Sequence, residues 1–166
     1  MLGATVVRVD HVGSTAVPGL VAKPIIDIEL SVPEVEDENA YLPPLASAGY
    51  LLRVREPDHR MVRTADRGVH VHVCSAGSDW ERRHLLFRDW LRHSAGDREA
   101  YGQLKCQLAR REWADMNEYA AAKAPLIDQI THRAQAWACS AGWAPTFNPR
   151  GDAARGVSTA SMPPGR

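Results

Sequence analysis

The densest signal in this 166-residue sequence reads Asp10-His-Val-Gly-Ser-Thr-Ala-Val-Pro-Gly-Leu20 and continues, two residues later, as Lys23-Pro-Ile-Ile-Asp-Ile-Glu29. The glycines, the serine and the prolines in its middle are typical of a loop. A short β-branched run precedes this loop, and the isoleucines that follow it predict a second strand. We therefore expect a strand, a polar turn and an acidic strand in direct succession.

The two acids of the second strand, Asp27 and Glu29, are candidate metal ligands and catalytic residues. Residues two apart on a strand point to the same face, so the two carboxylates repel each other. A bound cation relieves that repulsion, and Mg²⁺ favours one or two carboxylates together with phosphate oxygens. The alternative interpretation is the solvent-facing side of an ordinary half-exposed strand.

The turn Gly13-Ser14-Thr15 is a candidate phosphate site. Backbone N–H groups of a Gly-Ser turn can form a concave anion site, and the two hydroxyls add further donors. Phosphates held beside a carboxylate-bound metal are what a metal-assisted nucleotidyl transfer needs. The alternative is a turn that uses glycine and serine for backbone reasons alone. The spacing to the next glycine does not fit a P-loop.

The rest of the chain predicts an α+β domain with helices packed on a mixed or antiparallel sheet, followed by a helical C-terminal half. We expect strands over residues 6–12, 25–30, 50–55, 60–64 and 69–74, with a hairpin turn at 66–68. Acidic residues at 34–38 open a predicted helix that Pro43 and Pro44 kink and Gly49 ends. Three later helices are expected to begin at Ser78, Asp97 and Asp115, the last with a kink at Pro125. The domain covers residues 1–143, and the Pro-, Gly- and Ser-rich segment 144–166 is predicted to be a disordered tail.

Composition narrows the function classes. Twenty basic and twenty acidic side chains leave no net charge, so we expect no nucleic-acid partner. No apolar run approaches the roughly 20 residues that span a bilayer, and the start does not read as a signal peptide. The three cysteines are widely spaced, which argues against a disulfide framework and for a cytoplasmic location.

Four segments together resemble the GrpB family, which also occurs as a domain fused after dephospho-CoA kinase in some bacteria: His11–Leu20, Lys23–Ile28, His70–Val73 and Gly77–Leu91. The likeness runs from about residue 7 to residue 137. The family is similar to polymerase-β-type nucleotidyltransferases, whose hallmark is a Gly-Ser turn before an acid-x-acid strand. The resemblance implies a nucleotidyltransferase-like fold, with Gly13 and Ser14 at the phosphates and Asp27 and Glu29 at the metal.

Two features depart from that pattern. Where active nucleotidyltransferases carry a third carboxylate, this chain offers His70 and His72, which share one strand face. Imidazole suits Zn²⁺ better than Mg²⁺, so Mg²⁺ is expected first, with Zn²⁺ or Mn²⁺ as alternatives. If the two strands are neighbours, four side chains line one pocket; otherwise the histidines are half-buried and hydrogen-bonded. The chain also begins only about a dozen residues before the turn, whereas the family has a further segment there, and an uncovered sheet edge predicts self-association.

Three cations complete the predicted phosphate site: Lys23, Arg63 and Arg88. Guanidinium groups suit phosphate, although Arg88 could equally form an ion pair with Asp27 or Asp89.

Two functions remain open. The first is a metal-dependent nucleotidyltransferase that uses a nucleoside triphosphate and an unknown acceptor. The second is a non-catalytic nucleotide- or CoA-related accessory domain, with a protein partner in coenzyme A synthesis or a second copy of itself.

Overall fold

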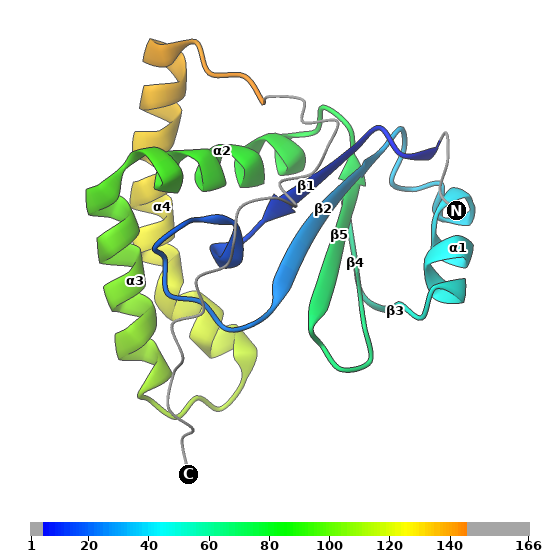
Figure 1. Ribbon diagram of the computed structural model, residues 1–166, viewed down its shortest axis with the longest axis horizontal. Helices are drawn as coiled ribbons and strands as arrows, with labels where there is room; N and C mark the ends of the chain where they lie inside the picture. Colours follow the sequence, from blue (N-terminus) through cyan, green and yellow to red (C-terminus); the bar gives the residue numbers. More distant parts are fainter. Residues whose placement is uncertain (1–4, 146–166) are drawn as a thin grey trace.

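A five-stranded mixed sheet forms the centre of the computed structural model, which describes residues 5–145 (Figure 1). The strands run in the order β1-β2-β5-β4-β3, and only β2 and β5 are parallel neighbours. Their bounds are β1 Arg8–Val12, β2 Ile26–Val32, β3 Leu51–Glu56, β4 His59–Arg63 and β5 Val69–Ser75. The predicted α+β class and all five predicted strands are therefore confirmed, with the ends shifted by one or two residues.

One face of the sheet is apolar because alternate residues of each strand point to opposite sides. Leu30 and Val32 of β2 and Val71 and Val73 of β5 are buried there in one cluster with Tyr41. The short helix α1 (Leu42–Ser47) covers this face, opposite the other helices (Figure 1).

The second face is polar, and three long helices lie on its side: α2 (Asp79–His93), α3 (Ala95–Ala109) and α4 (Met116–Ala141). The hydroxyl of Ser31 in β2 donates to Glu81 of α2. Arg88 of the same helix donates to Asp10 of β1 at 3.0 Å. Polar contacts therefore hold α2 against the sheet where an apolar interface would be usual.

The helix starts were predicted correctly at two of three places. The hydroxyl of Ser78 accepts the N–H of Glu81, and the carboxylate of Asp115 accepts two N–H groups of α4. Helix α3, however, begins after Ser94, whose hydroxyl accepts the N–H of Asp97. The Asp97 carboxylate instead accepts hydrogen bonds from Trp90 and Arg133, so the prediction of Asp97 as the cap was wrong.

The helix predicted over residues 34–49 was also wrong in extent. Only a 3₁₀ turn at Glu38–Ala40 and α1 form, and Pro43 and Pro44 lie in the first turn of α1, where a missing N–H costs little. Glu36 and Glu38 do not serve a helix dipole; they bind Arg60 of β4 at 2.6 and 2.5 Å.

None of the helices within residues 5–145 is long and apolar enough to cross a membrane. The tail predicted from residue 144 lies, apart from its first two residues, outside the described part of the chain.

Arg88 provides the first prediction, because it is 5% exposed and donates to Asp10, to Asp89 and to the His11 carbonyl. Burial alone would raise the pKa of Asp10, but hydrogen bonds from Arg8 and Arg88 outweigh it and lower that pKa. Breaking a buried ion pair costs about 3–5 kcal/mol, so Arg88→Ala should lower the free energy of unfolding by that order. Urea denaturation measures it, with the exposed Arg110→Ala as the control; equal effects of the two substitutions would contradict a structural role for Arg88.

Candidate metal and phosphate site

Gly13 ends β1 and brings the backbone of the turn against the carboxylate of Asp27. Its φ of 68° lies in the left-handed region, and a Cβ added there would lie 2.4 Å from Oδ2 of Asp27. A side chain at position 13 is therefore excluded both by strain and by space. Ser14 begins a short 3₁₀ helix, Ser14–Ala16, directly after this contact. The turn and the acidic strand converge as the sequence predicted.

Asp27 also lies between the two histidines of β5. The parallel pairing of β2 with β5 sets Asp27 opposite His70 and Glu29 opposite His72. Oδ1 of Asp27 is 3.4 Å from Nδ1 of His70 and 3.5 Å from Nε2 of His72. One donor atom from each of the three residues lies within 4.8 Å of the others, and all three side chains are half-buried. The three residues can therefore hold one metal ion.

His59 of β4 supports His72 from behind. Its Nε2 lies 3.0 Å from Nδ1 of His72, and its Nδ1 lies 3.4 Å from a carboxylate oxygen of Glu56. Burial, and then the neighbouring His72, lower the pKa of His59 and keep it neutral. A proton on Nδ1 facing Glu56 makes Nε2 an acceptor for Nδ1–H of His72. His72 then keeps a lone pair on Nε2, the atom that faces Asp27.

The rings of this region form a stack that continues into α2. Trp80 lies 4.5 Å from His59 and 3.6 Å from His84, measured between ring centroids. The stack packs against His59 and links the candidate metal cluster of Asp27, His70 and His72 to α2.

Glu29 lies on the same sheet face but does not join this cluster. It is 1% exposed, and neither of its carboxylate oxygens has a hydrogen-bond partner within the described residues. Burial, and then the charges of Glu81 and Asp10, raise its pKa to about 9. A protonated, enclosed carboxyl lacks the negative charge that binds a cation, so Asp27 is the one candidate acidic ligand of this cluster among the described residues.

The chain has three lysines, Lys23, Lys105 and Lys123; Lys105 contacts Ser14, and the charges of the other two act on it in turn, Lys123 on Lys105 and Lys23 on Lys123. Nζ of Lys105 donates to Oγ of Ser14 at 2.7 Å and to the carbonyl of Val21. Burial, and then Lys123, lower the pKa of Lys105 to about 8. Lys23 and Lys123 lie 5.7 and 4.5 Å from the centre of the Tyr119 ring. One lysine on a serine hydroxyl with two further lysines nearby is an arrangement suited to a polyphosphate.

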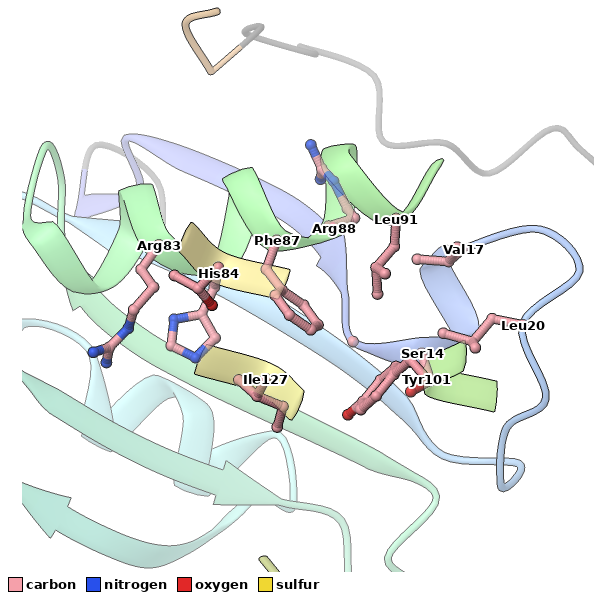
Figure 2. Close-up of a pocket in the computed structure, with 12 residues that line it drawn as sticks. Ser14, Val17, Leu20, Arg83, His84, Phe87, Arg88, Leu91, Tyr101 and Ile127 are labelled. Atoms are coloured by element: carbon pink, nitrogen blue, oxygen red, sulfur yellow. The ribbon is translucent and has the colours of Figure 1, made fainter. Parts of the chain in front are cut away.

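Ser14 also lines a cavity of about 260 Å³ (Figure 2). Its walls come from the turn and from α2, α3 and α4, and they are mainly apolar: Val17, Leu20, Phe87, Leu91, Tyr101 and Ile127. His84 lies at one end, so the ring stack reaches this cavity as well as the metal cluster.

The family model that describes GrpB protein matches residues 1–133. The chain belongs to the GrpB family. A UPF0157 protein of Streptomyces coelicolor is 52% identical over 135 residues, which cover 81% of this chain and 72% of that protein. A UPF0157 protein of Halalkalibacterium halodurans is 47% identical over 139 residues, 82% of this chain and 71% of that one. The family predicted from the sequence is confirmed.

A solved structure, that of conserved protein GrpB from Enterococcus faecalis, superposes with a TM-score of 0.71 at 33% identity, covering 80% of this chain and 82% of that one. The GrpB chain described here therefore has the predicted nucleotidyltransferase-like fold, with a mixed sheet and a helical C-terminal part. The dephospho-CoA kinase of Mycobacterium tuberculosis is 33% identical over 172 residues. This match covers 86% of the GrpB chain but only 42% of the kinase, so it involves less than half of that protein.

The remaining predicted phosphate contacts are placed differently. Thr15 lies 2.9 Å from Nε2 of His11 and donates to the carbonyl of Ile25, so its hydroxyl shapes the loop. Arg63 pairs in register with His70 and therefore lies on the far side of the metal cluster from Ser14. Arg88 is committed to Asp10 and Asp89, the second of its two predicted alternatives.

Sequence reasoning missed His59, Lys105 and Lys123 as site residues. A signal for the lysines was present: seventeen of the twenty basic residues are arginine, so the three lysines are the exceptions in this composition. His59 was hidden because its contact with His72 depends on the register of β4 with β5, where Met61 lies opposite His72.

The second prediction concerns His59. Replacing it by phenylalanine keeps the stacked ring but removes the hydrogen bond to His72, so Zn²⁺ affinity should fall about 10- to 100-fold. Competition with a chromophoric chelator measures the affinity, and the exposed His132→Phe is the matched control. An unchanged affinity in His59→Phe would show that His72 needs no support.

The third prediction follows from Glu29. The pKa of Glu29 is about 9 in the folded protein and 4.5 in the unfolded chain, because burial favours the protonated carboxyl. The contribution of Glu29 to the free energy of unfolding is therefore fully present below pH 4.5 and is lost as pH rises toward 9. Across this window the free energy of unfolding should fall by up to about 1.4 kcal/mol per pH unit.

Glu29→Gln should remove this dependence while keeping the shape of the side chain. Urea denaturation between pH 6 and 9, in EDTA to exclude metal effects, compares the two proteins. Parallel pH profiles for the native protein and the variant would mean that Glu29 is ionised in the folded state.

Proposed function

We propose that this GrpB protein is a metal-dependent nucleotidyltransferase whose ion is held by Asp27, His70 and His72. Its nucleoside triphosphate substrate would bind at the Gly13–Ser14 turn with Lys105, Lys123 and Lys23. One observation carries the proposal: Asp27 contacts the turn on one side and the two histidines on the other. A metal and a phosphate chain would then share a single contact zone.

The donor set supports a transition metal more than Mg²⁺. One carboxylate oxygen and two imidazole nitrogens are ligands that Zn²⁺ and other transition metals accept, whereas Mg²⁺ prefers oxygen alone. A bound ion of this kind polarises a phosphoryl oxygen and offsets its charge. Mn²⁺ remains compatible with the set, and the neutral state of Glu29 weakens the case for Mg²⁺.

The chain's own residues have distinct parts in such a transfer. Lys105 and Lys123 would hold the terminal phosphates, and Ser14 would add a hydrogen bond. An acceptor hydroxyl or amine would attack the α-phosphorus, the bond to the bridging oxygen would break, and pyrophosphate would leave while the acceptor's proton passes to solvent. Positioning and charge neutralisation supply most of the catalysis in such reactions.

A second candidate is a non-catalytic nucleotide- or CoA-related accessory domain. The enclosed, protonated Glu29 favours it, because the acid pair of the nucleotidyltransferase pattern is incomplete. The match to part of the mycobacterial dephospho-CoA kinases favours it too, and suggests a protein partner in coenzyme A synthesis. A cytoplasmic location suits both candidates, since all three cysteines are unpaired within the described chain.

Ligand-linked thermal stability tests the site. ATP, GTP, CTP or UTP with Zn²⁺ or Mn²⁺ should raise the melting temperature, because ligands that bind only the folded state stabilise it. Asp27→Asn should abolish the shift, whereas Asp128→Asn, at an exposed position on α4, should keep it.

Pyrophosphate release in the presence of candidate acceptors then separates the two candidates. Binding without release across acceptors would favour the accessory domain, and no shift with any nucleotide and metal would refute the nucleotide site itself.

A further inference from the structure

The cavity beside Ser14 has the walls of a ring-binding site. Phe87 and Tyr101 stand edge to face, with ring centroids 5.6 Å apart and planes at 89°. Ile127 of α4 lies across from Phe87, and Leu20 and Val17 close the end beside Ser14 (Figure 2). Aromatic and branched side chains around a hollow favour a flat apolar group.

Its size limits the occupant to one compact group. A cavity of about 150 Å³ holds a benzene molecule, and drug-sized ligands need about 300 Å³ or more. The volume of about 260 Å³ therefore suits one substituted ring or two fused rings.

Two of the polar side chains that line the cavity, His84 and Tyr101, are uncharged, whereas the guanidinium of Arg83 lies beside His84 at one end (Figure 2). Nδ1 of His84 lies 2.8 Å from the carbonyl of Trp80 and donates to it, which leaves Nε2 as an acceptor. Burial lowers the pKa of His84 to about 4 and raises that of Tyr101 to about 12, so both side chains are neutral at pH 7. In Figure 2 the side chain of Arg88 points away from the other side chains that line the cavity, and its guanidinium is bound by Asp10 and Asp89. The apolar walls favour an uncharged ring, and a ring with an N–H donor would find an acceptor in His84.

Ser14 connects this cavity to the phosphate site, because it lines the cavity and accepts the hydrogen bond of Lys105. We propose that the cavity binds the flat, uncharged ring of a phosphorylated ligand, with nucleobases as the best-fitting class. Ring and phosphates would lie on opposite sides of Ser14. The inference rests on the proposed phosphate site and adds what lies at the other end of the ligand.

Calorimetry with Zn²⁺ present can separate the two ends of the ligand. ATP, GTP, CTP and UTP each carry a ring and a triphosphate, whereas inorganic tripolyphosphate carries only the phosphates. We expect at least one nucleotide to bind tenfold or more tightly than tripolyphosphate. Phenyl phosphate against inorganic phosphate shows whether any flat ring suffices, and the ranking of the four nucleotides names the preferred base.

Two variants place the effect in the cavity. Ile127→Phe fills it, and His84→Phe keeps the stack on Trp80 while removing the acceptor. Each should reduce the nucleotide advantage to within about twofold of tripolyphosphate and leave tripolyphosphate binding unchanged, whereas Gln129→Phe, at an exposed position of α4, should change neither.

The failures are distinguishable. Nucleotides that bind no more tightly than tripolyphosphate, or that keep their advantage in both cavity variants, would overturn the ring site while the phosphate site stands. A protein that binds neither nucleotides nor tripolyphosphate would overturn both.

Discussion

The approach of the Gly13 backbone to the Asp27 carboxylate is the constraint on which the site depends. It works only because position 13 lacks a Cβ and can adopt a positive φ. The same carboxylate is then fixed from the other side by the pairing of β2 with β5, which sets His70 opposite it. A single aspartate therefore joins two features that lie more than forty residues apart in the chain. Widening either contact would separate the Gly13–Ser14 turn from His70 and His72.

The polar face of the sheet is the energetic cost of this arrangement. Asp10, Glu29 and Ser31 are all buried under α2, where apolar residues would be more stable. The protein offsets the cost in two ways. Asp10 remains charged because Arg8 and Arg88 bind it, and Glu29, which has no such partner, takes up a proton. Two carboxyl groups opposite each other in the β1–β2 pairing are thus pushed to different protonation states by their neighbours.

Local features of this fold could be predicted from the sequence, and long-range pairings could not. Strand positions follow from β-branched runs, and the Ser78 and Asp115 caps follow from side-chain chemistry. The parallel β2–β5 pair follows from neither, because four elements separate the two strands along the chain. The prediction that Asp27 and Glu29 share one face of the sheet was correct. Strand alternation does not say, however, how deeply a helix covers each position. The acids diverge because α2 encloses Glu29 and leaves Asp27 half-exposed.

The balance of charge then explains why the lysines matter as much as the acids. With Glu29 neutral, Asp27 is the one acidic group of the candidate metal cluster within the described residues, and His70, His72 and the charge of Lys105 lie near it. A divalent ion bound there would make this region strongly positive. Burial already lowers the pKa values of Lys105 and Lys123, so the positively charged forms of both lysines are disfavoured before any metal binds. A polyanion would relieve the repulsion among the cations and restore the ordinary protonation of Lys105. Metal and phosphate binding are therefore expected to favour each other, because each supplies the charge that the other requires.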